Sequence, residues 1–69
     1  MSNLAQLQES FETYKYTFEQ GQISADEYKS LLAGLEVEKA VTLNAEELQF
    51  KEHLHTAISA AISAASMIG

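Results

Sequence analysis

Two histidines separated by one residue, His53 and His55, are the side chains of this sequence best suited to binding a metal ion. Imidazole nitrogens are common ligands of zinc and copper, but a chelating pair must face one ion. The surrounding residues predict a helix, in which positions i and i+2 point in nearly opposite directions. Because the chain also has no cysteine, we expect no metal site within one chain. Histidines of several copies could still meet on the axis of a symmetric oligomer.

The remaining polar residues show no pattern of an enzyme. The adjacent acids Asp26–Glu27 and Glu46–Glu47 fall at predicted helix N-termini, where the helix dipole stabilises carboxylates. The serines are not part of a Gly-x-Ser-x-Gly motif or of a Ser/His/Asp pattern. No glycine-rich phosphate loop is present. We therefore expect no catalytic residues, no cofactor and no enzymatic activity.

The balance of charge argues against nucleic acid as a partner. The 69 residues carry ten acids and four lysines, without arginine, for a formal net charge of −6. An acidic surface repels phosphate, and the chain lacks arginine, the side chain that forms paired hydrogen bonds to phosphate and guanine. Binding to a basic protein surface stays open, and the charge also keeps a small apolar protein in solution.

The elements that carry these residues are helices, beginning with a segment over about residues 3–20. One apolar residue recurs every three or four positions there, which places a stripe on one face of a helix: Leu4, Leu7, Phe11, Tyr14 and Phe18. Tyr16 falls off this stripe, and we interpret it as an exposed interface anchor. Gly21 follows as a residue that takes positive φ at little cost and ends the helix.

A second helix has a strong start signal. Ser24 is placed as the N-cap and Glu27 as its reciprocal partner, with Ile23 and Tyr28 at the two positions of a hydrophobic staple. We expect this helix to run to Lys39 or Ala40, so that the hairpin covers residues 3–40. Gly34 then lies inside it, which indicates close approach of a neighbouring helix.

The same start chemistry recurs at residues 43–48, where Asn44 takes the place of the serine. From there the chain can continue as one long helix, which we expect over residues 45–68. From His53 to the end of the chain there is no formal charge.

The residues around the first turn resemble those of the SHOCT family of short bacterial helical hairpins. In that family a helix ends in Gly-x-Ile, and Thr or Ser then caps a second helix that carries Glu and an aromatic residue. The resemblance covers about residues 11–35 and lies in these positions: Gly21, Ile23, Ser24, Glu27, Tyr28 and Leu32. It implies a role in protein–protein contact or oligomerisation, without catalysis.

The uncharged helix needs a cover. Its small residues recur at i, i+4 spacing, which lets helix backbones approach closely in water or in lipid. A bilayer is the less favoured cover, because the uncharged stretch is short for a membrane span and no basic or aromatic anchors flank it. We expect a protein surface instead, with these interface residues: Tyr16, Leu54, Ala57, Ile58, Ala61, Ile62, Ala65 and Ile68.

Together these features predict one all-α domain over residues 1–69, with a capped helical hairpin followed by a long Ala/Ser/Ile-rich helix. We expect a small acidic interaction or assembly factor of a bacterium or phage that docks on a protein partner, on copies of itself, or on both, in the cytoplasm. The alternatives are a small protein associated with the inner membrane, or inserted in a membrane, through its uncharged last helix, a virion component, and an acidic inhibitor. The inhibitor would use Glu9, Glu12, Glu19, Glu36 and Glu38 to occupy a basic site on a host enzyme.

Replacing the cap residue tests the predicted hairpin. Ser24→Ala should lower the free energy of unfolding by about 1 kcal/mol, because the first turn of the second helix loses its side-chain acceptor. Thermal unfolding followed by circular dichroism measures this loss. An unchanged melting temperature would mean that the helix does not begin at this position.

Overall fold

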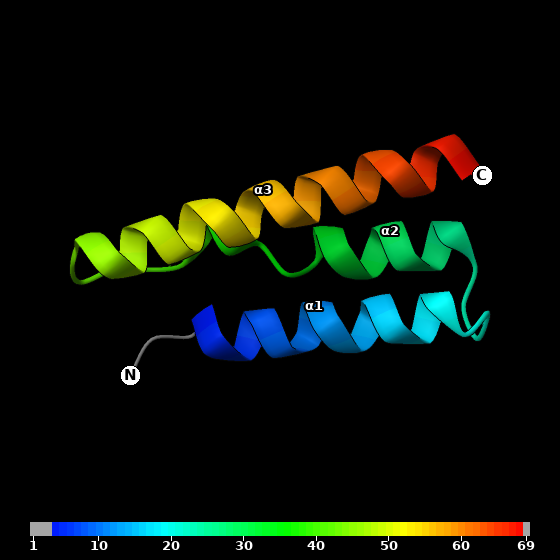
Figure 1. Cartoon of the computed structure of the whole chain (residues 1–69), viewed down its shortest axis with the longest axis horizontal. Helices are drawn as coiled ribbons and strands as arrows, with labels where there is room; N and C mark the ends of the chain where they lie inside the picture. Colours follow the sequence, from blue (N-terminus) through cyan, green and yellow to red (C-terminus); the bar gives the residue numbers. More distant parts are fainter. Residues whose placement is uncertain (1–3, 69) are drawn as a thin grey trace.

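The computed structural model describes residues 4–68 and confirms the all-α class with three helices (Figure 1). The helices are α1 (Leu4–Glu19), α2 (Ala25–Ala33) and α3 (Ala45–Ile68), with a short 3₁₀ turn η1 (Val37–Lys39) between the last two. Within residues 4–68 there is no strand. The expected helix start at residue 3 and the glycine at position 69 lie outside the described residues.

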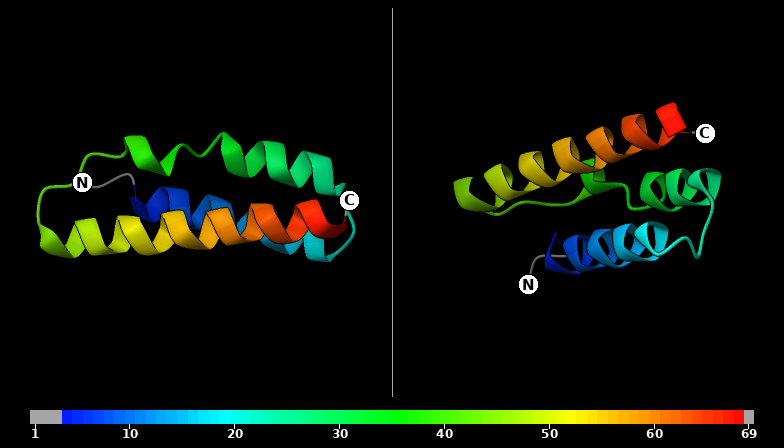
Figure 2. Two further views of the ribbon diagram at one scale, coloured as in Figure 1. Left: turned by 90° about the horizontal axis from the view of Figure 1, so that it is seen from above. Right: turned by 45° about the vertical axis from the view of Figure 1, so that its right-hand side comes forward.

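The three helices run side by side along a molecule of 37 × 19 × 15 Å. Figures 1 and 2 show that α1 and α3 run in the same direction and that α2, which connects them in the sequence, runs in the opposite direction. The segment formed by α2 and η1 lies along α3, which packs more extensively on α2 than on α1. The long helix is therefore covered on one side by its own chain.

The end of α1 is a hydrogen-bonded turn that needs glycine. The amide of Gln22 donates to the carbonyl of Thr17 at 3.1 Å, and the amide of Gly21 donates to the carbonyl of Phe18 at 2.9 Å. This pair of bonds is the Schellman motif, which requires a left-handed residue just past the helix. Gly21 takes that conformation, with φ of +74°, as its position in the sequence predicts.

The start of α2 has the predicted capping box. The Ser24 hydroxyl accepts from the Glu27 amide at 3.1 Å, and the Glu27 carboxylate accepts from the Ser24 amide at 3.2 Å. At α3 the corresponding pair is shifted by one residue. Asn44 Oδ1 accepts from the Glu47 amide at 2.9 Å, but the Glu47 carboxylate accepts from the amide of Leu43 at 2.7 Å.

The predicted end of the second helix, at Lys39 or Ala40, is wrong. α2 ends at Ala33, and the backbone turns at Glu36, whose φ of 48° is left-handed. A continued helix would rotate the Val37 side chain about 140° away from Leu32. The turn instead brings Val37 into the core, where it is 2% exposed. Burial of this valine therefore outweighs continuation of the helix.

Gly34 does not mark a close helix contact, contrary to the expectation from the sequence. It lies at the C-terminus of α2 with φ of −71° and ψ of −12°. A Cβ at this position would meet only the carbonyl oxygens of Leu31 and Ser30, at 3.5 and 3.6 Å. These are ordinary contacts within the same turn of the chain.

The core draws residues from every element. Among residues 4–68, seven side chains are buried: Leu4, Tyr28, Leu32, Val37, Leu54, Ile58 and Ala65. Leu32 is the largest side chain that the core encloses fully, at 1% exposed. Beside this core, Lys51 of α3 donates to the carbonyl of Ala40 at 2.8 Å and so fastens the segment after η1 to the long helix.

An aromatic stack joins α1 to α2. The rings of Phe18 and Tyr28 lie 4.4 Å apart between centroids and are nearly parallel, at 6°. Burial raises the pKa of the Tyr28 hydroxyl above its ordinary value of 10.0, and the charge of Glu19 raises it further. The folded chain therefore holds this proton to higher pH than the unfolded chain does.

The two glycines should respond to alanine in opposite ways. Gly34→Ala should raise the free energy of unfolding by about 0.5–1 kcal/mol, because its backbone suits alanine and the unfolded chain loses freedom. Gly21→Ala should lower it by about 1–2 kcal/mol, because a side chain is strained in the left-handed region. Urea unfolding of both variants measures the difference, and equal effects would contradict the two backbone conformations.

Burial of the Tyr28 hydroxyl makes the stability of the fold depend on alkaline pH. Because the Tyr28 pKa is raised in the folded state, its contribution is complete below about pH 10 and is lost as the pH rises further. In Tyr28→Phe this component of the alkaline loss should disappear, so that its stability relative to the parent improves above that pH. Urea unfolding across this range provides the measurement. Tyr16→Phe, at an exposed position of α1, is the control and should follow the parent.

Candidate interaction surfaces

Most of one apolar stripe of α3 lies against the rest of the chain. We call it the heavier stripe and define it by these residues: Leu54, Ile58, Ala61, Ile62, Ala65 and Ile68. Of the predicted interface residues, Leu54, Ile58 and Ala65 are buried, and Ala61 and Ile62 are half-buried against the same core. The first cover of the uncharged helix is therefore its own chain. In this fold these five side chains have little or no surface left for a partner.

The other three predicted interface residues are exposed and do not form one patch. Tyr16 projects from α1 with 62% of its surface exposed. Ala57 lines a hollow between α1 and α3, and Tyr16 is not part of that lining. Ile68 lies at the end of α3 with 71% exposed. Tyr16 and Ala57 therefore do not line the same hollow of the structure.

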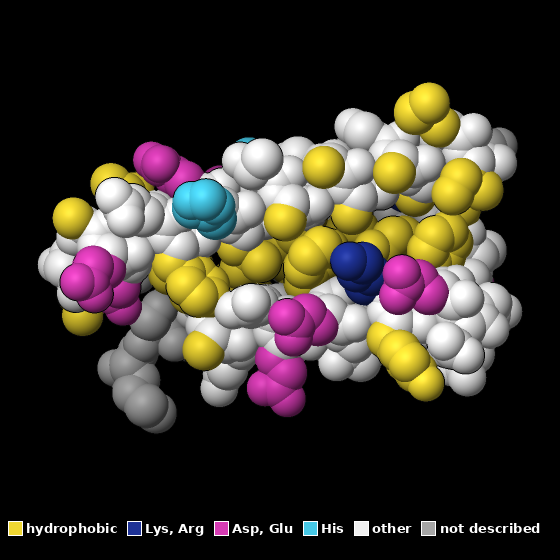
Figure 3. Space-filling view, viewed as in Figure 1, with side chains coloured by type: hydrophobic (Ala, Val, Ile, Leu, Met, Phe, Trp, Pro, Cys, Tyr) yellow, Lys and Arg dark blue, Asp and Glu magenta, His cyan; other side chains and the backbone are white. Residues whose placement is uncertain are grey.

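A second side of α3 faces solvent and carries no charge. We define this outer face by its exposed residues: Thr56, Ser59, Ala60, Ser63, Ala64 and Met67. Met67 is the most exposed large apolar side chain of the described chain, at 87%. In Figure 3 the right-hand half of α3 shows only hydrophobic and uncharged polar side chains. The outer face includes two of the small-residue rows seen in the sequence, Ala60 with Ala64 and Ser59 with Ser63.

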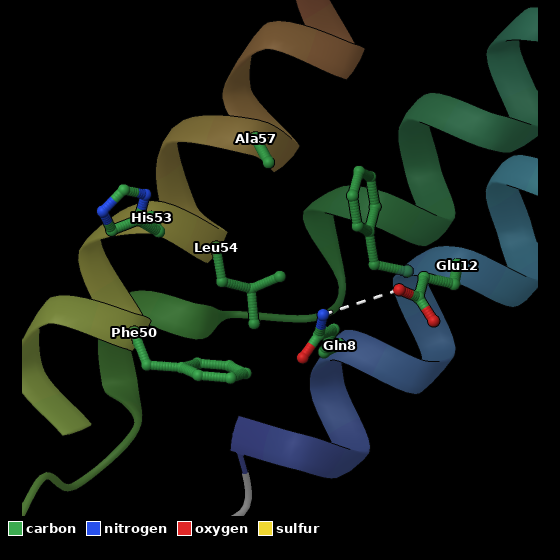
Figure 4. A pocket seen from close by; sticks show the side chains of 7 residues that line it. Gln8, Glu12, Phe50, His53, Leu54 and Ala57 are labelled. Carbon is green, nitrogen blue, oxygen red and sulfur yellow. Dashed lines mark hydrogen bonds between the residues drawn. The ribbon is translucent and has the colours of Figure 1, made fainter. Parts of the chain in front are cut away.

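An open groove lies between α1 and the first half of α3 and has a volume of about 310 Å³. Its lining mixes apolar and polar residues: Gln8, Phe11, Glu12, Phe50, His53, Leu54 and Ala57. Figure 4 shows Phe50 and Leu54 of α3 directed toward Gln8 of α1. On the rim formed by α1, Gln8 Nε2 donates to Glu12 Oε1 at 3.5 Å.

The groove continues toward the N-termini of both helices. A second hollow shares Phe50 and is lined further by Leu4, Ala5, Asn44, Glu46 and Glu47. Phe50 is the residue common to both parts, and 39% of its surface is exposed. We call the two parts together the α1–α3 groove.

The groove was missed by reasoning from the sequence. Phe50 lies one turn before Leu54 and continues the apolar stripe of α3 toward its N-terminus, whereas the expected interface began at Leu54. Gln8 and Glu12 lie off the apolar stripe of α1. The one available signal was Phe50 itself, a large aromatic residue on the stripe of α3 one turn before the residues expected at the interface. Which helix would face it depends on how segments far apart in the chain are packed.

The two histidines line different hollows. His53 is at the α1–α3 groove, whereas His55 lines a hollow beside η1 together with Glu38 and Glu52. Among residues 4–68 no three His, Asp or Glu side chains are grouped as a metal site would require.

Within the same described residues, none of the helices has the length and apolar character needed to cross a bilayer.

The five acids considered for an inhibitor are all exposed but do not share one face. Glu12 lies at the α1–α3 groove, and Glu9 lines a different hollow of α1. Glu36 forms an ion pair with Lys39 at 3.3 Å, and Glu38 lies beside His55. The five acids therefore do not form one acidic surface.

Comparison of the chain with protein-family models, with curated proteins and with solved structures found no match in any of the three. The likeness of residues 11–35 to SHOCT hairpins stays an interpretation of the sequence.

Proposed function

We propose that this chain is a small interaction or assembly factor that acts by helix–helix docking and associates with itself through the outer face of α3. The observation that carries the proposal is the separation of charge along the chain. All ten acids and all four lysines precede His53, so the second half of α3, including its exposed side, carries none.

This separation favours contact between copies at the outer face over contact elsewhere. Each copy has a formal charge of −6, and surfaces rich in carboxylates repel one another across a contact. Docking through the outer face keeps these carboxylates apart. Its alanines and serines also allow close approach of two helix backbones.

One hydroxyl beside the outer face already has a partner within its own helix. Ser66 Oγ already donates to the carbonyl of Ile62 at 2.9 Å, a bond within the helix that needs no water. Exposed Met67 and Ile68 add apolar surface beside the small residues. Covering them removes from water the two most exposed large apolar side chains of α3.

A charge placed on the outer face tests the proposal. We expect the parent chain to sediment as a dimer or larger species and Ala60→Glu to shift it toward the monomer, since the new carboxylate would be buried in the contact. Ala60 is exposed, so the fold should be retained, unlike with a substitution at half-buried Ala61.

Gln49→Glu is the matched control, because it adds the same charge to an exposed position of α3 before the uncharged stretch. It should leave the mass in solution as in the parent. A parent chain that stays monomeric over a wide concentration range, or equal effects of the two variants, would contradict self-association through the outer face.

A further inference from the structure

We propose that the α1–α3 groove binds an amphipathic helix of another protein, one whose apolar face is flanked by lysine or arginine. This deepens the proposed interaction role by assigning the chemistry of a partner to a second surface. The inference rests on three features of the groove: its dimensions, an exposed aromatic residue in it, and the negative charge of the residues along its rim.

The dimensions suit a short helix. On α1 the lining residues extend from Leu4 to Glu12, and on α3 from Glu46 to Ala57. At the rise of an α-helix these stretches are about 12 and 16 Å long, which is two to three turns. A partner helix of that length offers apolar residues at i, i+3 or i+4, and i+7.

The apolar floor of the groove is left partly uncovered by the fold. Leu54 is buried, but Phe50, one turn earlier on α3, keeps 39% of its surface exposed. Phe11 of α1 is half-buried in the same groove. A side chain inserted into the groove would bury surface of Phe50 that the chain itself leaves exposed.

The rim determines which helix fits. Glu12, Glu46 and Glu47 line the groove, and among the described residues none of the four lysines does. Two of those lysines are beside acids elsewhere, Lys29 near Asp26 at 3.4 Å and Lys39 near Glu36 at 3.3 Å. Glu46 and Glu47 lie in the first turn of α3, and Glu47 accepts from the Leu43 amide. Within residues 4–68 no lysine forms an ion pair with these three carboxylates, so the charge of the rim complements a basic helix.

A second copy of this chain does not supply such a helix. The apolar stripes of α1, α2 and the first half of α3 are flanked mainly by acids, and the second half of α3 has no charge. Two copies docked at this groove would place carboxylates against the rim. Charge complementarity thus favours a different, basic protein as the occupant.

Binding of designed peptides to the full chain tests the proposal, by fluorescence anisotropy. The probe is a labelled helical peptide of about three turns, with leucines at i, i+3, i+4 and i+7 and lysines on both flanks. One comparison peptide has glutamate in place of the lysines, and another has serine in place of the leucines. We expect the basic amphipathic peptide to bind, more weakly at high salt, and both comparison peptides to bind at least about tenfold more weakly.

Two pairs of variants locate the binding. Phe50→Ala should weaken it about tenfold or more, whereas Leu48→Ala, an exposed apolar residue of α3 outside the groove, should not. Glu12→Gln should weaken it several-fold, whereas Glu9→Gln makes the same charge change elsewhere on α1 and should have little effect. Circular dichroism of each variant verifies that the helices are retained.

Several outcomes would overturn the proposal. If the serine peptide binds as tightly as the basic amphipathic peptide, binding depends on net charge alone and not on apolar contacts in the groove. If the glutamate peptide binds as tightly, the acidic rim does not select the partner. Equal loss in Glu12→Gln and Glu9→Gln would exclude this groove. Loss of self-association in Phe50→Ala, with no peptide bound by the parent, would make the groove a contact between copies. Ala60→Glu separates the two proposals, because it should abolish self-association and leave peptide binding intact.

Discussion

The enclosure of Leu32 between the helices is the constraint on which the rest of the structure depends. Its helix, α2, has nine residues, which is too short to be stable in water by itself. It persists because α1 and α3 cover it and because the turn after it buries Val37 in the same core. The long helix is thus required for the hairpin, and its heavier stripe is used for this purpose before any partner is involved.

Local structure could be predicted from the sequence wherever a few adjacent residues decide the outcome. The bonds between Ser24 and Glu27, and the left-handed glycine at position 21, depend only on neighbouring positions and were predicted. The end of α2 was not, because a continued helix and the observed turn differ in where they put Val37. That choice is settled by the shape of a core built from residues far apart in the chain.

The outer face of α3 and the α1–α3 groove also differ in how far the sequence alone could predict them. The uncharged outer face of α3 follows from one stretch of sequence and could be anticipated, although the helix has a second, buried side. The α1–α3 groove is made by two segments that are distant in the chain, so that no single motif indicates it. Phe50 becomes part of a groove only because α1 lies opposite. Charge is divided in parallel with these surfaces, with acids around the groove and none on the outer face.

The turn between α1 and α2 is held by hydrogen bonds between residues no more than five positions apart. Contacts of such short range close small loops, so we expect this turn to form early in folding and the docking of α3 on α1 to come late. The groove then exists only in molecules that have completed folding. Anything that occupies it binds the native state and not its precursors. By mass action such an occupant would stabilise the native state and lower the fraction of unfolded chain that proteases can cleave. The abundance of this chain in a cell would then follow the abundance of its partner.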